Sequence, residues 1–127
     1  PVDRPSERSA PVAAVARPNV SILIDAMHFH RTGSTAASLA ALPPSHIGYA
    51  QICDVPRVAT IENYADEARF ARLSPGEGEL PLAEFVSALP PETVIGLEIP
   101  QRDKVLAGIA FENILAPAIA ATRALLA

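Results

Sequence analysis

The stretch "SILIDAMHFHRTG", residues 21–33, joins a short apolar run to a cluster of polar side chains. The run is rich in branched residues and is bounded by turn formers, a pattern typical of a strand buried on both faces, which we place at residues 19–25. Asp25 closes this strand, and two histidines and an arginine follow within six positions. These side chains either serve a metal or a substrate at the end of a strand, or belong to an ordinary polar loop.

Strand-like and helix-like segments alternate along the rest of the chain. Apolar runs bounded by turn formers predict two further strands, at residues 46–55 and 93–100. Periodic apolar residues with Pro or Gly at the ends predict helices, which we place at residues 10–17, 34–42, 63–73, 81–91 and 102–127, the last with a kink or break at Pro117. Such alternation predicts right-handed βαβ units and a parallel sheet, so the fold class is α/β.

A single domain accounts for the length of 127 residues. Residues 1–11 are rich in proline and charge and suit a flexible lead-in, which leaves residues 12–127 for the folded domain. The net charge is −4, with ten basic residues scattered among fourteen acidic ones, so we expect no nucleic-acid partner.

The sequence also argues against a membrane protein. No apolar run reaches the roughly 18 residues of a membrane span, and the N-terminus lacks the pattern of a signal peptide. The single cysteine, Cys53, lies in an apolar stretch and is expected to be a small buried hydrophobe. We therefore expect a cytoplasmic protein.

Each predicted strand carries oxygen-bearing side chains near its C-terminal end. These are Asp25 on the first strand, Gln51 and Asp54 on the second, and Glu98 on the third. Active sites of parallel α/β folds form at this end of the sheet, and buried carboxylates lose their hydration unless they share a partner. A hard divalent cation such as Mg²⁺ or Mn²⁺ would suit these oxygen donors.

Ordinary structural roles are open for the same residues. Asp25 could cap the turn after its strand, Gln51 could bond to backbone, and Glu98 could pair with Arg102. His28 is either a surface loop residue or a hydrogen-bond donor turned back into the site.

Other polar residues have weaker functional interpretations. We expect His30 and Arg31 to be loop residues, and His46 to be structural at the opposite end of its strand. The segment "SPGEGELP", residues 74–81, is interpreted as a turn into a helix, with anion binding by its backbone N–H groups as the alternative.

Several segments together resemble a known family. "NVSILIDAMHFHRTG", "IGYAQICDVP", "RLSPGEGELPLAEFVSALP" and "VIGLEIP" resemble, in this order, the C-terminal half of the xylose-isomerase-like barrel superfamily of sugar phosphate isomerases and epimerases. The resemblance covers about residues 12–127 and implies parallel βα units that form about half of a (β/α)8 barrel.

The resemblance also implies a metal site. The family holds a divalent metal with four side chains on different strands, and Asp25, Gln51 and Glu98 fall on the second, third and fourth of them. Mn²⁺ or Mg²⁺ is expected, with Co²⁺ as a further candidate. His28 falls on the Asp-x-x-His histidine that contacts substrate, and Arg57 falls near a substrate-binding arginine of some epimerases. Glu98 and His28 are therefore the candidate catalytic residues.

The resemblance implies a metal-dependent isomerase or epimerase that moves a proton next to the carbonyl of a sugar or sugar phosphate. Gln51 departs from the histidine of many epimerases and is found in some 3-dehydroshikimate-dehydratase-like members, so a lyase acting on a hydroxy-ketone acid is the alternative. The first metal-binding Glu and several strands have no counterpart here, so whether this chain alone is an enzyme stays open.

Half of a barrel would leave strand edges and apolar surface exposed. We therefore expect a homo-oligomer or a complementary half-barrel as partner. A truncated half-barrel that oligomerises without catalysing anything is the third interpretation.

Overall fold

The computed structural model describes residues 12, 14, 15 and 17–127. The predicted lead-in at 1–11 lies outside these residues, as does part of the short helix predicted at 10–17. The elements are β1 (Ile22–Asp25), α2 (Ala26–Arg31), α3 (Ala36–Ala40), the 3₁₀ turn η1 (Pro44–His46), β2 (Ile47–Ile52), α4 (Tyr64–Phe70), α5 (Leu82–Ser87), β3 (Val94–Leu97), α6 (Arg102–Leu106) and α7 (Phe111–Leu125).

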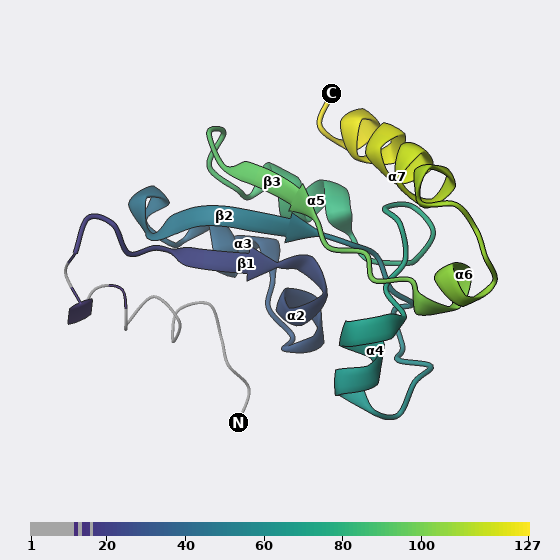
Figure 1. Ribbon diagram of the computed structural model, residues 1–127. Helices are drawn as coiled ribbons and strands as arrows, with labels where there is room; N and C mark the ends of the chain where they lie inside the picture. The colour runs from purple at the N-terminus through teal and green to yellow at the C-terminus, as the bar shows by residue number, and fades with distance from the viewer. Residues whose placement is uncertain (1–11, 13, 16) are drawn as a thin grey trace.

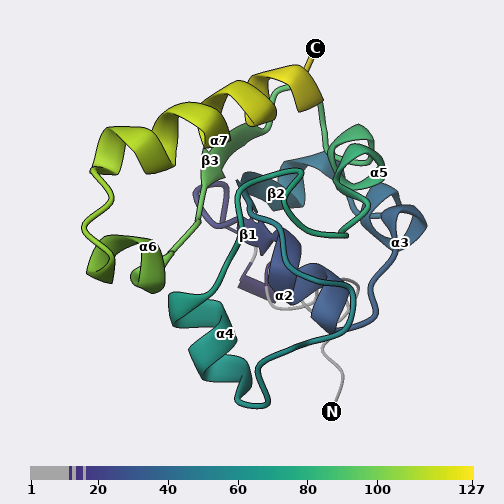
Figure 2. The same ribbon diagram turned by 90° about the vertical axis from the view of Figure 1, so that its right-hand side faces the viewer.

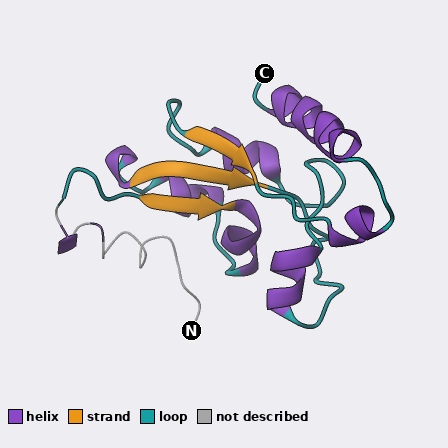
Figure 3. Ribbon diagram, viewed as in Figure 1, coloured by secondary structure: helices purple, strands orange, loops and turns teal. Residues whose placement is uncertain are grey.

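The three strands form one parallel sheet in the order β1-β2-β3 (Figures 1 and 3). The predicted α/β class with parallel βα units is confirmed, and the three predicted strands are present but shorter than expected. Within the described residues β1 and β3 each pair on one side only, so each has a free edge.

Helices α2, α3 and α5 pack on one face of the sheet and enclose the core with it (Figure 2). Alternate strand residues such as Ile24 and Ala50 point into this core, together with Phe29, Leu39 and Phe85 of the helices. Because side chains of a strand alternate between faces, Asp25 and Gln51 lie on the opposite face. That face also carries Leu23 and Val94, which are 47% and 63% exposed.

Helix α2 follows β1 directly, at positions where loop residues were predicted. Asp25 is its N-cap, because one carboxylate oxygen accepts the backbone N–H of His28 at 3.0 Å. The expectation that His30 and Arg31 are loop residues is therefore wrong, since both lie on this helix.

The C-terminal helical region breaks at a different place from the predicted one. The chain leaves α6 through Gly108, whose φ of 75° is open to glycine at little cost, and α7 then runs unbroken through Pro117. Pro117 and Asn113 are both exposed, so the carbonyl that proline leaves without a helical donor can bond to water. Among the described residues no helix has the length and apolarity needed to cross a membrane.

Candidate functional site

The C-terminal ends of the strands bring three predicted site residues to one edge and one face of the sheet. Asp25 and Gln51 are direct register partners across β1 and β2, and Gln51 faces Gly96 of β3. Glu98 lies two residues beyond Gly96, hence on the same face, and its backbone N–H donates to the carbonyl of Ile52 at 3.1 Å. Nε2 of Gln51 donates to Oε2 of Glu98 at 3.1 Å.

The ordinary alternatives for these residues are partly realised. Asp25 caps α2, as one alternative held. The side-chain amide of Gln51 bonds to Glu98 instead of backbone. No ion pair between Glu98 and Arg102 is described, because the guanidinium of Arg102 stacks on the ring of Phe70, 4.2 Å from the ring centre.

Asp25 is buried and forms an ion pair with Arg72, a residue for which no role was predicted. Nη1 of Arg72 donates to Oδ2 of Asp25, and both side chains are 5% exposed. Nε of Arg72 donates to the carbonyl of Ala68 at 2.8 Å. Burial alone would lower the pKa of Arg72, but the hydrogen bond and the charge of Asp25 raise it above its ordinary value.

His28 lies between Arg72 and Tyr64, which fixes its tautomer. Nη2 of Arg72 lies 3.2 Å from Nε2 of His28, and Nδ1 of His28 is hydrogen-bonded to the hydroxyl of Tyr64. A guanidinium can only donate, so Nε2 must accept and a neutral His28 carries its proton on Nδ1. Nδ1 then donates to the Tyr64 oxygen.

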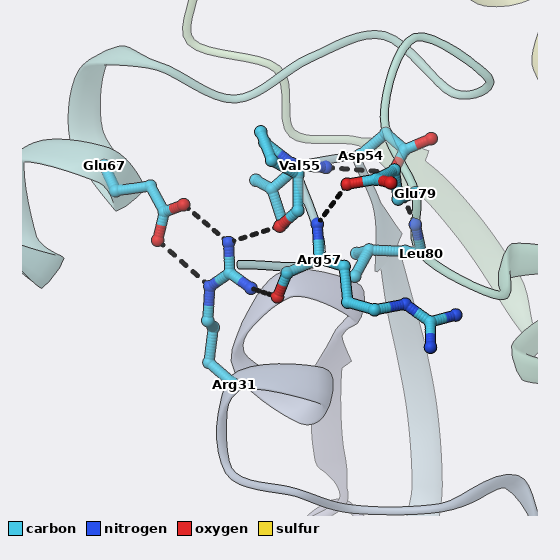
Figure 4. Close-up of polar contacts among 8 residues, drawn as sticks. Arg31, Asp54, Val55, Arg57, Glu67, Glu79 and Leu80 are labelled. Carbon is cyan, nitrogen blue, oxygen red and sulfur yellow. Dashed lines mark hydrogen bonds and ion pairs between the residues drawn. The ribbon is translucent and has the colours of Figure 1, made fainter. Parts of the chain in front are cut away.

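Arg31 lies one turn further along α2 and binds the segment that follows β2 (Figure 4). Its Nε and Nη2 donate to the two carboxylate oxygens of Glu67 at 3.1 and 2.6 Å. Its Nη2 and Nη1 also donate to the carbonyls of Pro56 and Arg57 at 2.8 and 2.9 Å. Arg31 therefore has a definite structural role, unlike the loop residue that was expected.

His30 is half-buried beside two aromatic rings of the core. Its ring centre lies 5.1 Å from that of Phe29 and 6.1 Å from that of Phe85. Burial lowers the pKa of His30 below its ordinary value, in spite of the opposing charge of Asp54. His30 thus packs against the edge of the core and stands apart from the strand-end cluster.

Asp54 uses its carboxylate to organise the loop at residues 74–80. Its two oxygens accept the backbone N–H groups of Val55, Leu80 and Gly76 at 2.9, 3.0 and 3.0 Å. Gly76 has a φ of 86°, and a Cβ on Gly78 would collide with the Asp54 carboxylate and lie 2.6 Å from the carbonyl oxygen of Val55. The interpretation as a turn holds, because the chain's own carboxylate takes the N–H groups of Gly76 and Leu80.

Arg57 lies at the surface. Its backbone N–H donates to Glu79 at 3.0 Å and its carbonyl accepts from Arg31, while its exposed guanidinium points away from the Arg31–Glu67 pair (Figure 4). The structure places no described contact between Arg57 and the strand-end residues, and its role in substrate binding stays a prediction.

Cys53 is buried, as predicted. Burial and the nearby charge of Asp25 raise the pKa of its thiol to about 11, although Nη1 of Arg72 lies 3.7 Å from the sulfur. The thiol is therefore protonated and inert at neutral pH.

The donor set fits a divalent cation in part. Asp25, Gln51 and Glu98 offer oxygen atoms, which suit Mg²⁺ or Mn²⁺, and carboxylate oxygens that already accept one hydrogen bond keep a further lone pair. Within the part of the chain that is described, no group of three His, Cys, Asp or Glu side chains could hold a metal by itself. The cation would thus need Gln51 and at least one ligand from elsewhere.

The comparison with protein families gives one result that covers nearly the whole chain. The family model described as xylose isomerase-like TIM barrel matches residues 2–124. The search among curated proteins gave no match.

Solved structures show the same likeness. The crystal structure of IolI protein with a binding zinc atom superposes with a TM-score of 0.79 at 25% sequence identity, covering 98% of this chain and 44% of IolI. A xylose isomerase domain protein from Alicyclobacillus acidocaldarius subsp. acidocaldarius gives a TM-score of 0.60 at 25% identity, covering 89% and 43%.

A fusion of a xylose isomerase-like TIM barrel with 4-hydroxyphenylpyruvate dioxygenase matches at a TM-score of 0.67 and 20% identity, over 78% of this chain and 16% of that one, and shows the fold alone. The chain therefore spans less than half the length of each of these structures, and its open parallel sheet matches part of a TIM barrel.

Proposed function

Because the chain belongs to the xylose isomerase-like TIM barrel family, we propose that it supplies part of the site of a divalent-metal-dependent isomerase or epimerase acting on a sugar or sugar phosphate. The observation that carries the proposal is the meeting of Asp25, Gln51 and Glu98 at one end and one face of three adjacent parallel strands. The bound zinc of IolI supports a metal at such a site.

In this proposal Asp25, Gln51 and Glu98 hold Mn²⁺, Mg²⁺ or Co²⁺. The metal, when bound, polarises the substrate carbonyl and a neighbouring hydroxyl. Glu98 is one acid/base of a pair that removes and returns the proton on the carbon next to that carbonyl, because its carboxylate is only half-buried and is hydrogen-bonded to a neutral amide. The second acid/base comes from the part of the barrel that this chain does not supply. Both ring nitrogens of His28 are hydrogen-bonded, to Arg72 and Tyr64, so in this proposal His28 exchanges its bond to Tyr64 for one to a substrate hydroxyl. Arg57 binds a polar or phosphate group at the rim.

The partner in this proposal completes the barrel. The free edges of β1 and β3 and the exposed Leu23 and Val94 leave a sheet face that another barrel segment can cover. A second copy of this chain or a complementary half-barrel would supply both that cover and the remaining metal ligand.

The proposal is tested in the completed barrel by Glu98→Gln. We expect this variant to lose exchange of solvent deuterium into the carbon next to the substrate carbonyl, together with turnover across a panel of sugars and sugar phosphates. Glu112→Gln, at an exposed position of α7, is the matched control and should keep both. An active Glu98→Gln variant would rule out the role of Glu98.

Gln51 favours one alternative, a lyase that dehydrates a cyclic hydroxy-ketone acid at the same metal site. The same substrate panel separates the two, because dehydration adds a double bond and a new ultraviolet absorbance, whereas isomerisation conserves mass. A metal-free monomer by size-exclusion mass and metal analysis would instead favour a non-catalytic half-barrel.

A further inference from the structure

Three polar contacts join the start of α2 to the segment that follows β2. Asp25, His28 and Arg31 are spaced by three residues, so they lie along one side of α2 and its N-cap. Their partners are, in the same order, Arg72, Tyr64 and Glu67. Residues 56–72, which we name the excursion segment, are therefore attached to α2 at three points.

The contact made by Arg31 is the most extensive of the three. Arg31 donates two hydrogen bonds to Glu67 and one each to the carbonyls of Pro56 and Arg57, so it binds both the beginning of the excursion segment and α4 (Figure 4). The Glu67 side chain is 3% exposed and that of Arg31 is 13% exposed. A forked, charge-assisted pair of this kind fixes distance and orientation together.

Helix α4 transmits this contact to the strand-end cluster. Tyr64, Glu67 and Ala68 all lie on this seven-residue helix, Tyr64 contacts His28, and the carbonyl of Ala68 holds Nε of Arg72. Because Glu67 lies on the same helix as Tyr64 and Ala68, its contact with Arg31 bears on the position of Tyr64 beside His28 and of Arg72 beside Asp25.

We propose that Arg31 and Glu67 are positioning residues: their ion pair docks the excursion segment on α2 and thereby holds Tyr64 against His28 and Arg72 against Asp25. The inference rests on contacts within this chain and does not depend on the proposed metal or reaction. It assigns a role to two residues outside the strand-end cluster, one of which was expected to be a loop residue without a role.

The test uses Arg31→Lys in the 127-residue chain, because lysine keeps the charge beside Glu67 and removes the fork that reaches the carbonyls. Nitrogen-15 NMR of the three histidines is the readout. In the parent chain His28 should show a protonated Nδ1 and an unprotonated Nε2. In Arg31→Lys we expect the chemical shifts of Nδ1 and Nε2 of His28 to move toward the values of a free histidine, in which the two tautomers exchange. The chemical shifts of His46 should stay unchanged.

Limited digestion with trypsin gives a second readout in the same samples. Arg57 and Arg69 are exposed residues of the excursion segment, whereas Arg123 is an exposed residue of α7. In Arg31→Lys we expect cleavage after Arg57 and Arg69 to be about tenfold faster, the effect of losing charged hydrogen bonds worth about 1.4 kcal/mol, and cleavage after Arg123 to be unchanged.

Two further variants make the result decisive. Lys104→Met is the control, because it removes an exposed ion pair, that with Glu77. It should leave the His28 chemical shifts and the rates of cleavage after Arg57 and Arg69 as in the parent. Glu67→Gln should reproduce the effect of Arg31→Lys. Three results would each overturn the proposal. They are unchanged His28 chemical shifts in both Arg31→Lys and Glu67→Gln, equally faster cleavage at every trypsin site in these two variants, or loss of the whole fold in both of them by circular dichroism.

Discussion

Asp25 is the last residue of β1 and Glu98 directly follows β3 of the same sheet, but the surroundings of the two carboxylates differ. Asp25 is buried, and its two oxygens accept from the N–H of His28 and from Arg72. Glu98 is half-buried, and its carboxylate accepts a hydrogen bond from the amide of Gln51. The strand-end cluster therefore has two sides. On the fixed side, at β1, α2 and the excursion segment occupy both oxygens of the carboxylate, whereas the side at β2 and β3 is open.

This asymmetry has a physical cause. A buried carboxylate without a partner costs several kcal/mol, so Asp25 requires the charge of Arg72 once α2 and the excursion segment cover it. Glu98 keeps contact with water and needs no such partner. A side chain that is free to change its ligands belongs on the open side, which agrees with the role proposed for Glu98.

The largest effect should come from Arg72→Met, which breaks the fixed side. It leaves Asp25 buried without a counter-charge, so we expect the free energy of unfolding to fall by about 3–5 kcal/mol. Urea denaturation followed by circular dichroism measures the change.

The double variant Asp25→Asn with Arg72→Met is the control for that prediction. Because it removes both charges, it should recover part of the lost stability, and the double-mutant cycle then gives the coupling between the two residues. A loss below 1 kcal/mol for Arg72→Met, or strict additivity in the cycle, would contradict the description of β1 as the fixed side.

Gly78→Ala should lower the stability by an intermediate amount. Gly78 lies against the carboxylate of Asp54, whose two oxygens accept three backbone N–H groups. The added Cβ would collide with the Asp54 carboxylate and approach the carbonyl of Val55, and overpacking of this kind costs about 1–3 kcal/mol. Thermal unfolding measures the loss.

Gly108→Ala is the matched comparison for Gly78→Ala. A Cβ on Gly108 meets no atom within 4 Å, so this variant should lose only about 1 kcal/mol of stability, from the strain of alanine at a φ of 75°. Equal losses in the two variants would show that the space beside Asp54 does not constrain the loop.

The sequence was sufficient to predict the parallel sheet and the oxygen-bearing side chains at the strand ends, because apolar runs and their polar ends are local signals. Asp25, Gln51 and Glu98 could be placed together from the rule that parallel strands end at one edge. The helix at residues 26–31 was missed because its N-cap also closes the strand, which leaves no turn between the two elements.

Arg72 and Tyr64 could not be predicted as members of the cluster. Both lie in the excursion segment, and their contacts join residues 36 to 47 positions apart, so their placement depends on how α4 docks. The break in the C-terminal helix was misplaced because the cost of Pro117 depends on its exposure, which is a tertiary property.

Glu98→Gln should have the smallest effect on stability and so tests the open side directly. The carboxylate is half-buried and no described ion pair includes it, so replacing it with an isosteric amide should change the free energy of unfolding by less than about 0.5 kcal/mol. The same urea titration used for Arg72→Met measures this. A loss comparable with that of Arg72→Met would mean that Glu98 is as structurally fixed as Asp25. A near-neutral result, combined with lost deuterium exchange in the completed barrel, would assign stability to the β1 side and chemistry to the β3 side.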